Sequence, residues 1–255
     1  MSDDLSVSVD GHVGVLEFRR PPNNHFDLTL LRDLADAAAE LESARGCRAI
    51  VLCSEGRHFC AGVDFGGEGV GPDPDTSLRA IYAEGLRLFS VPVPVVAAVQ
   101  GAAVGGGLGV ACAADFRVAA PSTRFHANFG ALGIHQGFGL SASLPRIIGA
   151  QGAAEMLYTA RRVTGEKALA LGLADWLVED GKVREAAVAY AHEIAANAPL
   201  AVRSMRQTLR SGYVDEVRAA MEREVTEQTR LLATSDSEAG IEASLARAAP
   251  VFTGK

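Results

Sequence analysis

Two glycine-containing stretches decide the fold, GRHFCAGVD at residues 56–64 and GAAVGGGLG at residues 101–109. Each follows a short apolar run with the composition of a buried strand, at residues 49–53 and 95–99. Consecutive glycines at 105–107, ahead of a helical pattern, leave bare backbone N–H groups at a helix N-terminus, where the helix dipole favours an anion. Two such turns aimed at one point would form an oxyanion hole. The alternative is that the glycines only permit close packing of a strand on a helix.

The residues around these stretches predict strands that alternate with helices. Asn24 and Asp27 are candidate caps for a helix that ends near Glu42. The other elements expected in this half are strands at residues 13–18 and 115–119 and a helix at residues 77–89. This alternation is typical of an α/β core with parallel strands.

The second half of the sequence is predicted to be mainly helical. Thr164 is a candidate cap for a helix that ends before Gly172, and a further helix is expected over residues 183–197. Later helices carry apolar stripes, formed by Val202, Met205 and Leu209 and by Val217, Met221, Val225 and Leu232, and Ser235 with Glu238 has a capping-box pattern. We therefore divide the chain into a core at residues 1–195 and a C-terminal helical region at residues 196–255. Those helices either cover the core or bury a subunit contact.

Composition excludes several classes of function. The chain has 255 residues and a net charge of −7, which argues against nucleic acid or an anionic membrane as the main partner. Residues 91–114 carry no charge, yet prolines, glycines and Gln100 within them favour a buried strand, a turn and a buried helix over a membrane span. The acidic N-terminus lacks the apolar core of a signal peptide.

The cysteines indicate a reducing compartment. All 4 (Cys47, Cys53, Cys60 and Cys112) lie in apolar stretches without a CxxC spacing. Buried, reduced thiols in a cytoplasmic protein are therefore expected, rather than disulfides or a metal site.

Taken together, these segments resemble the crotonase superfamily, also called the enoyl-CoA hydratase/isomerase family. The resemblance covers nearly the whole chain. It is carried by RPPNN (20–24), FCAGVD (59–64), the glycine turn at 101–107, DFRVA (115–119), VTG (163–165) and the ending APVF (249–252). It implies a spiral of ββα turns that forms two sheets, followed by C-terminal helices that build homotrimers or homohexamers.

The resemblance also implies an acyl-CoA substrate, a role in fatty acid metabolism and no other cofactor. The thioester oxygen would lie between the backbone N–H groups of Val63 and Gly106, which should then be within about 8 Å of each other. Asp64 would support this loop. The residues expected near the coenzyme A moiety are Asn24, His25, Phe26, Ala61 and Phe252.

The sequence departs from the family where hydratases carry two glutamates that position and deprotonate water. The resemblance places these glutamates at Gly109 and Phe129, and it places the aspartate of dienoyl isomerases and aryl-CoA dehalogenases at Gly137. None of these residues can carry a proton, so hydration by two carboxylates is unsupported.

His135 is the remaining titratable side chain in the segment that borders the acyl pocket of relatives. Its ordinary pKa near ~6.5 suits proton transfer, so we expect it in the cavity as the catalytic acid or base. The alternative is a histidine in a surface loop. His126 is expected to be structural.

Three hypotheses follow. The first is an enzyme that stabilises a thioester enolate for isomerisation, decarboxylation or carbon–carbon bond hydrolysis. The second is a conventional enoyl-CoA hydratase with an unrecognised base. The third is a catalytically silent acyl-CoA-binding protein.

Overall fold

The computed structural model describes residues 3–43, 45–63 and 70–255. Within this part, the strands form one six-stranded sheet in the order β1-β2-β3-β4-β6-β9 and one three-stranded sheet in the order β5-β7-β8. The strands are β1 (Leu5–Asp10), β2 (Val13–Phe18), β3 (Ala49–Ser54), β4 (Val95–Val99), β5 (Ala102–Val104), β6 (Phe116–Ala119), β7 (Arg124–His126), β8 (Arg162–Thr164) and β9 (Trp176–Leu177). From β2 to β9 the larger sheet is parallel, which confirms the predicted α/β class.

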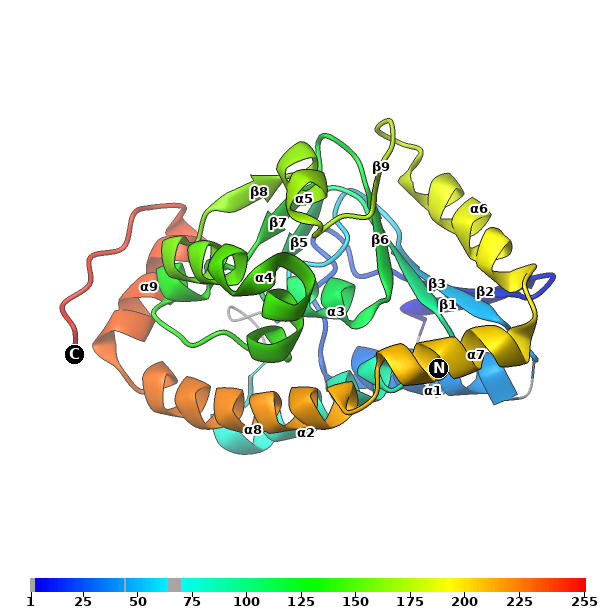
Figure 1. The fold of residues 1–255 in the computed structure, drawn as a ribbon. Helices are drawn as coiled ribbons and strands as arrows, with labels where there is room; N and C mark the ends of the chain where they lie inside the picture. Colours follow the sequence, from blue (N-terminus) through cyan, green and yellow to red (C-terminus); the bar gives the residue numbers. More distant parts are fainter. Residues whose placement is uncertain (1–2, 44, 64–69) are drawn as a thin grey trace.

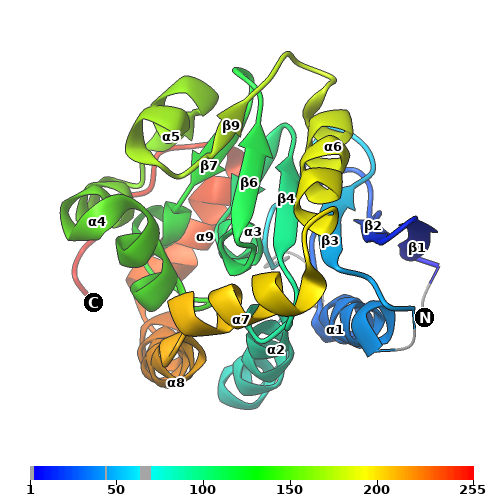
Figure 2. The same ribbon diagram turned by 45° about the vertical axis from the view of Figure 1, so that its right-hand side comes forward.

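Helices surround both sheets, as Figures 1 and 2 show. They are α1 (Leu28–Ser43), α2 (Pro74–Phe89), α3 (Gly106–Ala113), the 3-10 helix η1 (Asn128–Leu132), α4 (Leu140–Thr159), α5 (Gly165–Leu171), α6 (Val183–Ala195), α7 (Pro199–Leu209), α8 (Tyr213–Leu232) and α9 (Ser235–Ala246).

The larger sheet is covered on both faces, which explains why every residue of β3 and β4 is buried and why all but Ser54 are apolar. Alternate residues of β3 face opposite ways. Val51 belongs to a small cluster completed by Ala187 and Ala191 of α6, whereas Ile50 and Leu52 belong to the main core, which also contains residues of α1, α2, α3 and α8. This arrangement leaves α3 inside the molecule, with its N-terminus close to the turn after β3.

Two of the predicted helix starts are confirmed. The Leu30 N–H donates to Asp27 Oδ1 at 2.8 Å, and Thr164 caps α5 by accepting from the Lys167 N–H. Asn24, the other candidate cap for α1, has a different role: its side-chain amide donates to the carbonyls of Glu55 and His58. Asn24 therefore fastens the preceding loop to the turn that begins after β3.

The predicted capping box of α9 is wrong by one residue, because Thr234 rather than Ser235 accepts from the Ser237 N–H. The helix predicted at residues 77–89 is α2, and it begins earlier than predicted, at Pro74, where Asp73 provides the cap. In both cases a second side chain with capping chemistry lies nearby, and the local pattern alone does not choose between the two.

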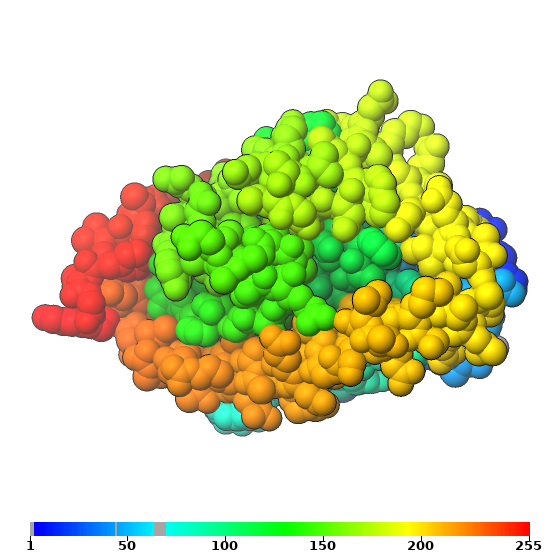
Figure 3. Space-filling view, in the orientation of Figure 1, coloured from blue at the N-terminus to red at the C-terminus, as the bar shows by residue number. Residues whose placement is uncertain are grey.

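The apolar stripe of α8 packs within this chain. Val217, Met221 and Val225 are all buried in the main core, where α8 lies against α2. The stripe therefore does not supply the exposed subunit contact considered above. The helix α7 differs: it has no buried residue, and Leu200, Met205 and Leu209 are exposed. Figure 3 shows α7 and α8 as a continuous band, yellow to orange, along the lower side of the molecule.

The uncharged stretch at residues 91–114 forms β4, β5 and α3 inside the molecule. In the part of the chain that the structure describes, no helix is both long and apolar enough to cross a membrane. The four cysteines are free and buried, which confirms the prediction of buried thiols.

Candidate functional site

The two glycine-containing turns lie directly against each other. The Cys60 N–H donates to the Ala102 carbonyl at 3.0 Å, and the Val104 N–H donates to the Cys60 carbonyl at 2.9 Å. A Cβ atom at Gly107 would overlap the Cys60 carbonyl oxygen, so only glycine allows this approach. Gly62 has a φ of +83°, which also favours glycine. These contacts hold the turn after β3 against the N-terminus of α3.

The backbone nitrogens of Val63 and Gly106 are brought together by this packing. A Cβ atom at Gly62 would lie 3.1 Å from the Gly106 nitrogen, and the Val63 nitrogen is two covalent bonds from the Gly62 Cα. Bond lengths therefore keep the two nitrogens within about 7 Å, which meets the predicted distance. Gly106 is the first residue of α3, so its N–H has no acceptor within the helix. Asp64 lies outside the described residues.

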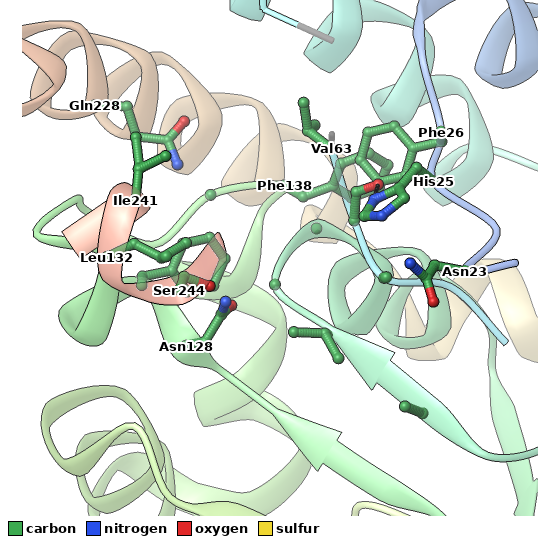
Figure 4. Close-up of a pocket in the computed structure, with 18 of the residues that line it drawn as sticks. Asn23, His25, Phe26, Val63, Asn128, Leu132, Phe138, Gln228, Ile241 and Ser244 are labelled. Carbon is green, nitrogen blue, oxygen red and sulfur yellow. Dashed lines mark hydrogen bonds between the residues drawn. The ribbon is translucent and has the colours of Figure 1, made fainter. Parts of the chain in front are cut away.

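A cavity of about 360 Å³ opens at this point. Figure 4 shows Asn128, Leu132 and Ser244 on one side of it and His25, Phe26 and Val63 on the other. The lining residues are Asn23, His25, Phe26, His58, Ala61, Gly62, Val63, Leu78, Tyr82, Ala102, Val104, Gly105, Gly106, Asn128, Phe129, Leu132, Gly137, Phe138, Gln228, Ile241, Ser244 and Leu245. The cavity therefore joins the two turns to walls that come from α2, α8 and α9.

Five of the residues predicted for the site line this cavity: Val63, Gly106, His25, Phe26 and Ala61. The Phe26 N–H donates to the Gly62 carbonyl at 3.0 Å, and His25 Nδ1 lies 3.3 Å from the same oxygen. The loop before α1 is thereby fixed to the turn after β3.

Asn24 and Phe252 do not line the cavity. The Asn24 side chain is 1% exposed because it is occupied by the loop contacts described above. Phe252 lies instead at a shallow depression that also includes Gly133, Asp236 and Lys255. The tail is held there by Asp236, whose carboxylate accepts from the N–H groups of Thr253 and Gly254.

His135 also lies outside the cavity, contrary to the geometric part of our expectation. Its ring Nδ1 is 2.7 Å from the Gln136 carbonyl, and its own carbonyl accepts from Gln228 Nε2 at 2.8 Å. The segment faces the cavity with Gly137 and Phe138 instead. The proposed acid or base role of His135 therefore has no geometric support.

The walls of the cavity carry no carboxylate from any described residue. At Gly109, the space for a side chain is filled by Phe138, whose Cβ would lie 2.6 Å from an added Cβ. At Gly137, an added Cβ would overlap the Tyr82 hydroxyl. Phe129 lines the cavity with an apolar ring. At the three positions to which the resemblance assigns a family carboxylate, this chain has glycine (Gly109 and Gly137) or phenylalanine (Phe129).

Sequence reasoning missed the polar groups that do line the cavity. Tyr82 comes from α2 and Gln228 from α8, and the two are hydrogen-bonded at 2.6 Å. Asn128 Oδ1 and His58 Nδ1 are buried without a hydrogen-bond partner among the described residues. Burial, with a smaller effect of Arg57, lowers the pKa of His58. One signal was present in the sequence: Gln228 follows Met221 and Val225 on the same helix face, where a polar residue is unexpected.

Glu224, a buried glutamate of α8, has a structural role. Glu224 is fully buried, and its carboxylate accepts from the N–H groups of Gly139 and Ser141 at 2.7 and 2.8 Å. Burial raises the pKa of Glu224, although these hydrogen bonds oppose the change. The side chain therefore caps the N-terminus of α4 from α8 and does not line the cavity.

Comparisons with known proteins agree with this architecture. Residues 9–255 match the family model described as enoyl-CoA hydratase/isomerase. The chain is 32% identical over 255 residues to a Bacillus subtilis protein named probable enoyl-CoA hydratase, covering 98% of this chain and 99% of that protein. A Rhodobacter capsulatus protein with the same name is 34% identical over 223 residues, or 86% of this chain and 87% of that one.

A solved structure named enoyl-CoA hydratase/isomerase, from Pseudoalteromonas atlantica, superposes with a TM-score of 0.84. Its sequence identity is 28%, and the match covers 98% of this chain and 100% of that one. The family match, the curated relatives and the shared fold lead to one conclusion. This chain is a member of the enoyl-CoA hydratase/isomerase family of enzymes, within the crotonase superfamily.

Proposed function

We propose that this protein acts on acyl-CoA thioesters by stabilising an enolate. In this proposal the thioester oxygen accepts hydrogen bonds from the N–H groups of Val63 and Gly106. The observation that carries the proposal is the approach of these two nitrogens at the wall of a cavity, at the N-terminus of α3. When the α-carbon becomes carbanionic, negative charge moves to the thioester oxygen, where fixed N–H dipoles stabilise it without reorganising.

The cavity lining favours chemistry other than hydration by two carboxylates. Among the described residues that line it, the titratable side chains are His25, His58 and Tyr82. Burial raises the pKa of Tyr82 well above 10, so its phenol remains protonated at neutral pH. We therefore favour isomerisation, decarboxylation or carbon–carbon bond hydrolysis, in which the coenzyme A of the substrate is the only cofactor and the reaction takes place in the cytoplasm.

Two alternatives remain open. The names of the relatives favour a conventional hydratase, which would need a base that the described lining residues do not provide as a carboxylate. A catalytically silent binder would keep the two N–H groups only as a clamp for the thioester.

Mass spectrometry of an acyl-CoA panel incubated with the purified protein in D₂O would separate an active enzyme from a silent binder. We expect at least one thioester either to be converted or to gain deuterium at its α-carbon, because enolate formation exposes that carbon to solvent protons. Saturable binding without conversion or exchange of any thioester would identify a silent binder. Absence of binding to every acyl-CoA would contradict the proposed function itself.

We further propose a homotrimer or homohexamer. Leu200, Met205 and Leu209 of α7 are 80%, 59% and 74% exposed, which is unusual for large apolar side chains on one short helix. A second copy of this chain would cover them. We expect sedimentation to show an assembly of three or six chains, and a stable monomer of 26.6 kDa at micromolar concentration would contradict this proposal.

A further inference from the structure

We infer that the buried pair Tyr82 and Gln228 forms a subsite for a neutral hydroxyl group on the acyl chain of the substrate. This hydroxyl group is already present when the substrate binds and is not a product of hydration. This inference rests on the proposed acyl-CoA function. Tyr82 comes from α2 and Gln228 from α8, and both line the cavity although they are only 6% and 4% exposed. Both side chains therefore border the cavity with a small part of their surface and are otherwise enclosed by protein.

The hydrogen bonds of Tyr82 and Gln228 determine which of their atoms donate and which accept. Gln228 Nε2 lies 2.8 Å from the His135 carbonyl, which can only accept, so the amide nitrogen must face that carbonyl. Gln228 Oε1 therefore faces Tyr82, and the phenol donates its proton to it at 2.6 Å. With its proton committed, the phenolic oxygen is an acceptor.

The pair retains one acceptor and one donor for a ligand. A phenolic oxygen has two lone pairs, and the hydrogen bond to Gln228 uses its proton rather than either of them. The amide of Gln228 has a second N–H besides the one given to His135. A hydroxyl group can donate to the former and accept from the latter. A carboxylate or an ammonium group would find no lysine, arginine, aspartate or glutamate among the described lining residues.

Gly137 is the residue that makes room for this pair. A Cβ atom there would overlap the Tyr82 hydroxyl oxygen and lie 2.6 Å from Gln228 Nε2. The phenol and the amide thus occupy the space into which a side chain from residue 137 would extend. In this chain residue 137 has no side chain, and the space beside it is filled by polar groups from α2 and α8.

Asn128 provides an independent indication that the ligand is polar. Its Oδ1 atom is buried without a hydrogen-bond partner among the described residues, and the residue lines the same cavity. An alkyl chain would leave this acceptor unpartnered, whereas an acyl group with a hydroxyl can donate to it. A hydroxyl group suits either orientation of the Asn128 amide, because it can both donate and accept.

The alternative is that the hydrogen bond between Tyr82 and Gln228 only holds α2 against α8. Binding measurements distinguish this structural role from recognition of a hydroxyl group. We would titrate the wild type and Tyr82→Phe with hexanoyl-CoA, 3-hydroxyhexanoyl-CoA and 6-hydroxyhexanoyl-CoA by calorimetry. The wild type is expected to bind at least one hydroxylated thioester about tenfold more tightly than hexanoyl-CoA, roughly the contribution of one hydrogen bond. Tyr82→Phe should abolish this preference and change the affinity for hexanoyl-CoA by less than about threefold.

Tyr213→Phe is the matched control. Tyr213 is a buried tyrosine like Tyr82, but it lies on α8 and does not line the cavity. This variant should keep the preference. If Tyr82→Phe does not fold, Gln228→Met is expected to abolish the preference by removing the amide. Equal binding of all three thioesters to the wild type, or a preference that survives in the folded Tyr82 and Gln228 variants, would overturn the inference alone. If the wild type binds none of the three, the inference fails, and the proposed function fails with it only when no other acyl-CoA of the panel binds either.

Discussion

Crotonyl-CoA is expected to be hydrated by this protein at least about a hundredfold more slowly than by a family hydratase that carries both glutamates. A general acid or base typically contributes about 10²–10⁴-fold, and the described lining of the cavity offers no carboxylate. Loss of the ultraviolet absorbance of the conjugated enoyl thioester measures the rate. A turnover near ~10 s⁻¹, the median for enzymes, would show that a base exists which we have not located.

A pair of variants tests whether the missing carboxylates explain the slow rate. Phe129→Glu would place a carboxylate at the cavity wall, so any recovery of hydration should come from this change. Gly109→Glu is the control, since the space beside Gly109 is filled by Phe138 and the new side chain would displace that ring. Equal recovery in both variants would contradict our account of the cavity.

The backbone part of the site could be predicted because its signals are local. Glycine at 62 and at 107 is required by a positive φ in one case and a close backbone contact in the other, and both requirements are visible as motifs. The same holds for Asp27 and Thr164, whose capping chemistry acts within one helical turn. These short-range requirements account for the starts of α1 and α5 and for the glycines that let the two turns approach each other.

The wall of the cavity that contains Tyr82 and Gln228 could not be predicted because its residues come from distant parts of the chain. Tyr82 and Gln228 are brought together only when α8 packs on α2. The direction of the segment before α4 depends on left-handed backbone conformations at Gly133, Phe138 and Gly139, with φ of +69°, +59° and +73°. The structure therefore presents Phe138 to the cavity and leaves His135 outside it, which no periodicity of the sequence indicates.

Replacement of Gly106 by proline is expected to lower turnover by about 10²–10³-fold relative to replacement by alanine. Both variants add a Cβ atom, which would lie 2.7 Å from the Phe26 ring, but only proline removes the N–H. Loss of one oxyanion-hole donor has an effect of this size. Gly106 is the first residue of α3, a position where helices tolerate proline because the N–H has no partner within the helix. Turnover would be measured on the thioester that the D₂O screen identifies.

The comparison of Gly106→Pro with Gly106→Ala removes the effect of the added Cβ atom from the test. Crowding of Phe26 by this atom is common to both variants, so it cancels in the ratio of their rates, whereas the loss of the N–H and the added Cγ and Cδ atoms belong to proline alone. A binding measurement extends the test beyond turnover: a thioether analogue of hexanoyl-CoA lacks the carbonyl oxygen and cannot accept from Gly106. The alanine variant should bind the thioester more tightly than the thioether, and the proline variant should lose part of that preference. Equal rates and equal preferences in the two variants would show that the Gly106 N–H does not contact the thioester oxygen, and the function proposed here would lose the observation that carries it.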